Sequence, residues 1–475
     1  MRFDGIRTSS FYTPAKNLGL ALNAGLLFAL SFPPYRLPIC LPFAVALLLR
    51  GLNGLSVRQG VMVGIACGCV YFGGTLFWLA SLFGAGAISL CLILAAFVAL
   101  FSALTVWLKR TLPEIPLWIL APVVWTAVEW YRSEVFVLKF GWMGLGYALV
   151  HAPRLAYGAS LLGCYGLSFG VMMAGAWLAS APNSLNLRQR VAWFLPVWAL
   201  SLYMPRPIPT PQRPLNVRLV QGMPPFTDDL IALSRSKSAA PLDIIVWPEY
   251  SLMEDPIRNT ELWGQLQSLA KESRSYFLFG GKDQPNAEDE KRFWNTAYLL
   301  DPTGRLIGRH VKNHIVHFIQ DGIAGTEARS IPTPLGRLGV AICFDMDYPD
   351  VARRLTQDGA EVFLVPNMDP EEWSALQRVQ HRLMFQMRAI ECGRWLARSD
   401  VAGGTSLVAP TGREVARIKS AASGYIDVRA GRESGRTLYI RGGWLLPYLC
   451  ALALGLMSGL GIRRSVLRGW ALRKA

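Results

Sequence analysis

Cys343, Glu249 and Lys312 have side chains that can combine in nucleophilic catalysis. Cys343 follows the apolar, β-branched run Leu338 to Ile342, which predicts a buried strand that ends in a thiol. A thiol is mostly protonated near neutral pH, so a nucleophilic cysteine needs a neighbouring base that accepts its proton. A carboxylate can be that base, and a fixed ammonium stabilises both the thiolate and the oxyanion of a tetrahedral intermediate.

Glu249 and Lys312 also follow strand-like runs, the first of them Ile244 to Pro248. Taken singly, a buried cysteine is more often a core residue, a glutamate after Trp-Pro a turn residue, and a lysine in a polar stretch a solvated one. The chain order Glu, Lys, Cys at strand ends favours a shared site, because strands support reactive side chains rigidly. We expect Trp247 to support this site.

The surrounding sequence predicts a layered α/β domain from Leu215 to Ile440. Strand-like runs alternate there with helical stretches such as 260–273 and 374–388, and this alternation is typical of such a domain. The strand-like runs are 217–220, 244–246, 276–279, 297–300, 339–342, 362–365, 395–398 and 406–408.

The 8 cysteines predict neither a metal site nor a disulfide framework. Only Cys343 and Cys392 lie in the α/β region, and no CxxC or His-Cys grouping has the spacing of a metal-ligand set. The others lie in apolar segments, where we expect small packing residues: Cys40, Cys67, Cys69, Cys91, Cys164 and Cys450. We therefore predict no metal and no cofactor.

Composition predicts that the rest of the chain lies in a membrane. Hydrophobic residues make up 52% of the chain and charged residues 17%, and the mean hydropathy is +0.29. Most acidic residues lie between Asp228 and Glu433. We predict a multi-span membrane domain at 1–205, a Pro-rich linker at 206–214, a catalytic α/β domain at 215–440, and a C-terminal transmembrane helix with a basic tail at 441–475.

Eight helical spans are expected, because about twenty apolar residues cross a bilayer as a helix. They are Leu18 to Pro33, Pro38 to Arg50, Gly60 to Leu82, Gly86 to Leu108, Ile115 to Tyr131, Leu155 to Ser180, Val191 to Pro205 and Trp444 to Ile462. The first is interpreted as a signal anchor, since no clear small-residue cleavage site follows it.

The distribution of basic residues predicts the orientation of these spans. One side is richer in them and should be cytoplasmic, which leaves the α/β domain external. That side holds Arg2, Arg7, Lys16, Arg50, Arg58, Lys109, Arg110, Arg188, Arg190 and the basic tail. The net charge of +16 therefore indicates contact with anionic lipid headgroups, and no nucleic-acid-binding pattern is present in the sequence.

Short motifs in both halves resemble those of the nitrilase superfamily, and nearly the whole chain is similar to the apolipoprotein N-acyltransferases, its membrane-bound branch. In the apolar half the motifs are ALSFPPYRLP (29–38), GCVYFGGTLFW (68–78), WTAVEWYR (125–132) and FGWMGLGY (140–147). In the α/β half they are LVQG (219–222), VWPE (246–249), KNHIVHF (312–318), VAICFD (340–345), QH (380–381), RAIECGR (388–394) and YIRGGW (439–444).

This resemblance implies a nitrilase-like α-β-β-α sandwich with Glu249 as general base, Lys312 as oxyanion stabiliser and Cys343 as nucleophile. It implies ping-pong transfer of an acyl chain from a phospholipid donor to the N-terminal amine of a diacylglyceryl-cysteine apolipoprotein acceptor. We expect a monomer embedded in the bacterial inner membrane, with the catalytic domain on the periplasmic face.

Several residues depart from the family pattern. Gln320 stands where the family has Glu, His317 and Ile319 stand at its Pro and Gly positions, and Asp345 stands where Glu is common. The segments at 224–226 and 367–373 also differ. A carboxylate at 320 would favour the charged form of Lys312. With Gln320 there, either Asp321 or Asp345 compensates, or the rate or the substrate has changed.

Two other functions are consistent with the same residues. In a membrane-tethered amide or nitrile hydrolase, water would replace the amine acceptor. In a non-catalytic binding module, Cys343 would not react with a thiol probe or an acyl donor. A lipid-linked product, as opposed to a released acid, distinguishes transfer from hydrolysis.

Overall fold

The computed structural model describes residues 9–180, 207–222, 227–286, 292–316, 319–419 and 421–474, with residue 289 and a few positions between 188 and 198. Two compact units form. The first comprises Met1–Gly158, Leu162–Met204 and Trp444–Ala475, and the second Ala159–Leu161 and Pro205–Gly443. Most of the span expected at 191–205, and the departures at 224–226 and His317, lie outside the described residues.

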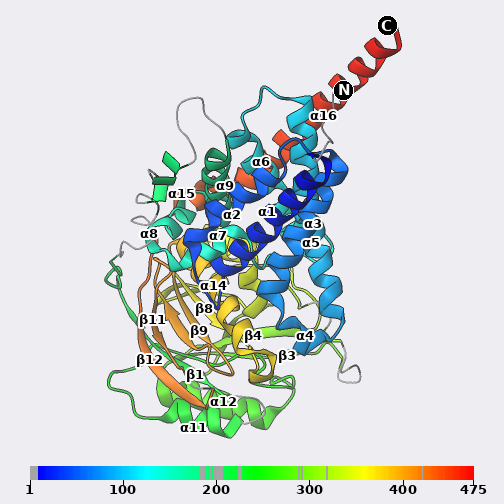
Figure 1. The fold of residues 1–475 in the computed structure, drawn as a ribbon. Coiled ribbons are helices and arrows are strands. Elements are labelled where there is room, and N and C mark those ends of the chain that lie inside the picture. Colours follow the sequence, from blue (N-terminus) through cyan, green and yellow to red (C-terminus); the bar gives the residue numbers. More distant parts are fainter. Residues whose placement is uncertain are drawn as a thin grey trace, which may run out of the picture. The chain divides into compact units, whose positions relative to one another are not determined.

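The first unit is helical (Figure 1). Its longer helices are α1 (Ser9–Ser31), α2 (Leu41–Gly51), α3 (Val57–Leu76), α5 (Gly86–Thr111), α6 (Leu117–Trp130), α9 (Ala159–Ala179) and α16 (Leu446–Lys474). Short helices α4 (Leu79–Phe83), α7 (Leu145–Ala148) and α8 (Pro153–Ala156) lie between them. In the described part of the chain, four helical segments are long and apolar enough to cross a membrane: Val57–Leu76, Gly86–Thr111, Ala159–Ala179 and Gly443–Leu467.

The ends of several expected spans differ from the observed helices. The expected span Gly60 to Leu82 is divided between α3 and α4, and the expected start at Leu155 falls in α8, before α9. The expected span at 115–131 corresponds to α6, which has 14 residues and continues into a π-helical turn at Tyr131–Val135. Hydropathy does not detect the break between α3 and α4, because Phe77 and Trp78, which lie at it, are apolar too.

Glycines let α3 pack closely on α5. A Cβ atom on Gly64 would lie 2.5 Å from the Ala99 Cα, and one on Gly68 would lie 2.6 Å from the Ala95 Cα. Small residues of this kind are typical of helix contacts in membranes, where close backbone approach supplies the attraction.

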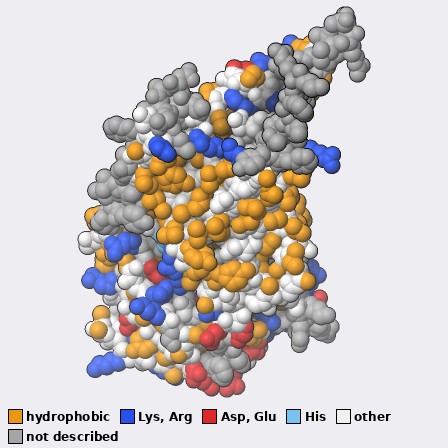
Figure 2. Space-filling view, in the orientation of Figure 1, with side chains coloured by type: hydrophobic (Ala, Val, Ile, Leu, Met, Phe, Trp, Pro, Cys, Tyr) orange, Lys and Arg blue, Asp and Glu red, His pale blue; other side chains and the backbone are white. Residues whose placement is uncertain are grey.

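The outer surface of these helices is apolar. Leu18, Leu22 and Leu26 on α1 and Ile88 and Leu92 on α5 are exposed, and Figure 2 shows hydrophobic side chains gathered over helices of this unit. Such a surface is stable against lipid and unfavourable in water.

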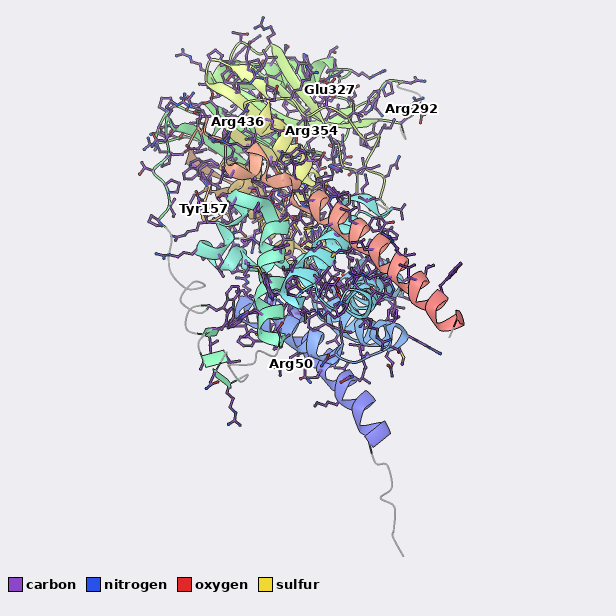
Figure 3. The ribbon with its side chains drawn as sticks, turned by 90° about the horizontal axis from the view of Figure 1, so that it is seen from above. Arg50, Tyr157, Arg292, Glu327, Arg354 and Arg436 are labelled. Atoms are coloured by element: carbon purple, nitrogen blue, oxygen red, sulfur yellow. The ribbon has the colours of Figure 1, made fainter. Side chains whose placement is uncertain are left out.

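Basic residues lie at the ends of two of the apolar helices. Arg50 is in the last turn of α2 (Figure 3), and Lys109 and Arg110 are in the last turn of α5. Cations at a helix C-terminus interact favourably with the helix dipole. These residues are among those that the sequence assigns to the cytoplasmic side.

The second unit has two six-stranded sheets. The first has the order β12-β1-β2-β3-β4-β5, with β1 (Leu215–Gln221), β2 (Ile244–Val246), β3 (Tyr276–Asp283), β4 (Trp294–Leu300), β5 (Leu306–Val311) and β12 (Gly424–Ala430). The second has the order β11-β10-β9-β8-β7-β6, with β6 (Ile331–Thr333), β7 (Gly336–Val340), β8 (Val362–Pro366), β9 (Trp395–Ser399), β10 (Ser406–Val408) and β11 (Glu414–Arg417).

One hydrophobic core joins the two sheets, and it includes Leu219 and Val246 from the first and Val340 and Leu364 from the second. A second core packs the outer face of the first sheet against α11 (Thr227–Arg235) and α12 (Thr260–Ser273). Helices α13 (Pro349–Gln357) and α14 (Ala375–Cys392) contact strands of the other sheet. The layers are therefore α-β-β-α, which confirms the predicted fold class.

Candidate active site

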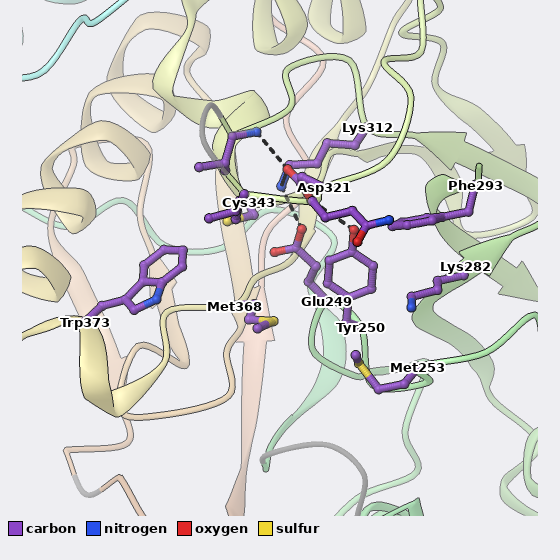
Figure 4. Close-up of a pocket in the computed structure, with 13 residues that line it drawn as sticks. Glu249, Tyr250, Met253, Lys282, Phe293, Lys312, Asp321, Cys343, Met368 and Trp373 are labelled. Atoms are coloured by element: carbon purple, nitrogen blue, oxygen red, sulfur yellow. Dashed lines mark hydrogen bonds and ion pairs between the residues drawn. The ribbon is translucent and has the colours of Figure 1, made fainter. Parts of the chain in front are cut away.

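Three strand ends bring the predicted residues to one cavity in the second unit. Glu249 follows β2, Lys312 directly follows β5, and Cys343 follows β7. All three line a cavity of about 430 Å³ (Figure 4). β2 is buried and apolar, and so are the last three residues of β7, 338–340, so the core between the sheets holds the backbone that supports Glu249 and Cys343.

Glu249 and Lys312 form a buried ion pair. The Lys312 Nζ lies 2.8 Å from the Glu249 Oε1, and their side chains are 1% and 2% exposed. Asn295 on β4 donates a second hydrogen bond of 2.6 Å to the same Oε1. Burial, with the charge of Asp321, raises the pKa of Glu249 against the lowering effect of Lys312. A carboxylate with a raised pKa is a better proton acceptor.

Asp321 is the second carboxylate on Lys312. Its Oδ2 lies 2.7 Å from the Lys312 Nζ, and its Oδ1 accepts hydrogen bonds from Tyr250 and Asn295. Burial alone would lower the pKa of Lys312, but the charges of Glu249 and Asp321 raise it well above its usual value. Lys312 is therefore a fixed cation at any physiological pH.

Cys343 begins a short 3-10 helix, Cys343–Asp347, at a sharp turn of the chain. Its φ of +45° lies in the left-handed region, which residues with side chains seldom adopt and which recurs at functional sites. Burial first, and then the charge of Glu249, raise the pKa of the thiol, while Lys312 and a backbone hydrogen bond from Met368 lower it. The net direction is upward, so the resting thiol is protonated.

Asp345 ties the turn after Cys343 to the loop after Lys312. Its Oδ1 accepts hydrogen bonds of 2.8 and 2.9 Å from the backbone N–H groups of Asn313 and His314, and its Oδ2 accepts one of 3.0 Å from the N–H of Ile342. A fourth hydrogen bond joins it to His310 at 2.9 Å. Asp345 therefore positions the two loops and does not contact the Lys312 ammonium.

A second buried ionic network lies behind the 367–373 loop, which carries Met368 and Trp373 on the cavity wall. His381 on α14 joins Asp369 at 2.8 Å and Asp347 at 2.9 Å. Burial alone would lower the pKa of His381, but the charges of Asp369 and Asp347 raise it to about 10. Arg398 on β9 also pairs with Asp369. This network fixes the loop whose backbone reaches Cys343.

Gln320, Trp247 and Cys392, the other residues considered in the sequence, form no hydrogen bond or ion pair with Glu249, Lys312 or Cys343 in the described structure. Gln320 lines the cavity but is exposed, and of the two suggested carboxylates Asp321 is the one that contacts Lys312. Trp247, expected to support the site, lies in the core against α11, where its indole N–H donates to Ser234. Cys392 is buried at the end of α14, and burial raises its pKa to about 12.

Tyr250, Asn295 and Met368 were not identified in the sequence, although each contacts a predicted residue or its partner. Asn295 was detectable in principle as a polar side chain on a mostly apolar strand. In the part of the chain that the structure describes, no group of three or more His, Cys, Asp or Glu side chains is arranged to hold a metal ion.

Comparison with known proteins gives two family matches in chain order. Residues 24–177 match the apolipoprotein N-acyltransferase N-terminal domain, and residues 223–436 match the carbon-nitrogen hydrolase family. An apolipoprotein N-acyltransferase of Geobacter metallireducens is 26% identical over 95% of this chain and 96% of its own. One from Pseudomonas putida is 28% identical over 93% of this chain and 96% of its own.

Solved structures also resemble part of the chain. A carbon-nitrogen hydrolase from Helicobacter pylori G27 is 18% identical, with a TM-score of 0.40, over 50% of this chain and 94% of its own. The two family matches, and bacterial relatives of the same name along nearly the whole chain, confirm the resemblance found in the sequence. Along nearly its whole length the chain is therefore similar to the apolipoprotein N-acyltransferases, and its second family match is to the carbon-nitrogen hydrolases.

Proposed function

We propose that the protein transfers an acyl chain from a membrane phospholipid to the N-terminal amine of a diacylglyceryl-cysteine apolipoprotein, by way of a thioester on Cys343. The observation that supports this most is the buried Lys312, which bridges Glu249 and Asp321 in the cavity that Cys343 lines. The names of the full-length relatives support the choice of acceptor.

In the first half-reaction, Glu249 accepts the proton of the Cys343 thiol, and the sulfur attacks the ester carbonyl of the donor. Lys312 stabilises the oxyanion of the tetrahedral intermediate, and its fixed charge suits that role. As the C–O bond breaks, Glu249 returns the proton to the departing oxygen. The products are a lysophospholipid and the Cys343 thioester.

In the second half-reaction, the free amine of the acceptor attacks the thioester carbonyl, and Glu249 accepts a proton from it. The C–S bond breaks, the sulfur regains a proton, and an amide remains on the acceptor. The raised pKa of Glu249 matches a group that must both accept and return a proton in each half-reaction.

Anchoring in a bilayer suits two lipid substrates, because it limits their orientations and raises their effective concentration near the cavity. We propose that the protein lies in the bacterial inner membrane with the second unit on the periplasmic face, since the basic residues favour that orientation.

A product assay tests the proposal. Full-length protein in detergent micelles receives a phospholipid labelled in its acyl chains and a diacylglyceryl peptide with a free N-terminus. We expect label in an amide of that peptide, and none in a control peptide whose amine is acetylated. Label in free fatty acid, with either peptide, would contradict the proposal and favour a hydrolase.

A further inference from the structure

One cation in the cavity lining has no role in the proposed mechanism. Lys282 lies near the end of β3, and its ammonium sits 4.9 Å from the centre of the Phe293 ring, which also lines the cavity (Figure 4). Cation–π contacts of this kind hold an ammonium in place without cancelling its charge. Lys282 is partly buried, so its charge is less well screened than that of a fully solvated lysine.

The register of the sheet places Lys282 beside the proposed reaction centre. Lys282 on β3 is directly opposite Asn295 on β4, and opposite residues of an antiparallel pair project from the same face. Asn295 donates to both Glu249 and Asp321. A group bound by Lys282 would therefore lie next to the proposed nucleophile, general base and oxyanion stabiliser.

The carboxylates that form ion pairs near Lys282 do so with other cations. Glu249 and Asp321 both contact Lys312, and the nearby acids Asp283 and Asp255 pair with Arg309 and Arg258. Within the described residues, no ion pair includes Lys282. Of the two lysines in the cavity lining, Lys282 is the one whose charge is free to bind an anion.

Most of the remaining cavity lining is apolar. Met253, Val316, Ile319, Met368 and Trp373 line it, and the side chains of Met253 and Ile319 are about half exposed. A ligand that matches both parts has one anionic group for Lys282 and a hydrocarbon chain for these residues. A phospholipid has both, whereas a neutral ester has only the second.

We propose that Lys282 binds the phosphate group of the acyl donor and so distinguishes a phospholipid from other esters. The inference rests on the proposed function. It also separates the two half-reactions, because the diacylglyceryl-cysteine acceptor carries no phosphate. Lys282 then acts in formation of the thioester and not in its aminolysis.

The test compares Lys282→Gln and Lys282→Arg with wild-type protein and with Lys271→Gln, a control on the exposed α12 lysine. Thioester formation is followed in detergent micelles with phosphatidylglycerol and with p-nitrophenyl palmitate, which has no phosphate. For Lys282→Gln we expect the second-order rate constant to fall about tenfold with phosphatidylglycerol and to stay unchanged with the neutral ester. Lys282→Arg and Lys271→Gln should keep the wild-type rates with both.

Pre-formed thioester completes the test. Its rate of aminolysis by a diacylglyceryl peptide should be the same in Lys282→Gln and wild type. An equal loss with both donors, a slower aminolysis, or no change with phosphatidylglycerol would overturn the role of Lys282. If wild-type protein forms no thioester with either donor, the proposed function itself fails.

Discussion

Replacement of Asp321 by Asn tests the ion pair between Asp321 and Lys312. The Asp321 Oδ2 lies 2.7 Å from the Lys312 Nζ. At an effective dielectric constant of about 20, unit charges at that distance attract by about 6 kcal/mol, which is an upper limit. Asn keeps an oxygen acceptor, and Glu249 keeps its own contact with Lys312. We therefore expect the interaction with Lys312 to weaken by about 3 kcal/mol, the lower end of the range for a broken buried ion pair.

Asp321→Asn should slow thioester formation and also lower the stability of the folded protein. Without the charge of Asp321, which helps to raise the pKa of Glu249, Glu249 becomes a weaker base. If about 3 kcal/mol is lost from the transition state, thioester formation slows by roughly a hundredfold. Single-turnover acylation of Cys343, followed by intact-protein mass, measures this rate, and thermal unfolding in the same detergent measures the stability.

Gln320→Glu is the matched comparison. Gln320 is exposed and lies beside Asp321, so a carboxylate there meets solvent and adds little to the field at Lys312. We expect a rate close to that of wild type. A faster Gln320→Glu together with an unaffected Asp321→Asn would show that residue 320, and not 321, supports Lys312.

Three further predictions concern pH, the buried histidine and topology. Thioester formation needs ionised Glu249, so the rate of thioester formation should rise with pH through a pKa above the usual glutamate range. A rate that does not change from pH 5 to 8 would contradict the assignment of Glu249 as the base. His381→Gln should destabilise the second unit by about 3 kcal/mol near neutral pH. The pKa of His381 is raised to about 10 in the folded protein, whereas in the unfolded chain it is near 6.5. The stabilisation from protonated His381 is therefore complete below pH 6.5 and is lost as pH rises toward 10. The free energy of unfolding, measured against pH, should show that decline in wild type and not in the variant. A reporter fused after Lys474 should be cytoplasmic and one inserted near Asn286 external, and the same side for both would refute the span count.

Much of the second unit could be predicted because its strands are short, buried and apolar. The runs at 244–246, 362–365 and 395–398 all became strands that pack between the sheets. β6, β11 and β12 were not expected. They contain Pro332, Glu414 or Asp427 and lie at sheet edges, where one side of the strand has no partner and polar residues are tolerated.

The positions of Glu249, Lys312 and Cys343 were accessible from sequence because each follows a strand. Their partners were not, since a contact such as that of Asn295 with Glu249 depends on how β4 is placed beside β3. Trp247 shows that nearness along the chain does not place a residue in the site. It is next but one to Glu249 along the chain, yet it packs in the opposite core.

Which of Asp321 and Asp345 contacts Lys312 could be seen only in the three-dimensional structure. Both carboxylates lie near Lys312 or Cys343 in sequence, and both are buried. Asp321 contacts the Lys312 ammonium, whereas Asp345 binds backbone N–H groups on two loops. Sequence spacing does not distinguish an acid that pairs with a cation from one that accepts backbone hydrogen bonds.

Intact-protein mass after incubation with phospholipid tests the central claim, that Cys343 forms a thioester, most directly. We expect wild-type protein and Cys392→Ala to gain the mass of one acyl chain, and Cys343→Ala to gain none. The added mass should be lost on treatment with hydroxylamine, which cleaves thioesters. An adduct that persists in Cys343→Ala, or an equal loss of the adduct in Cys392→Ala, would contradict the account.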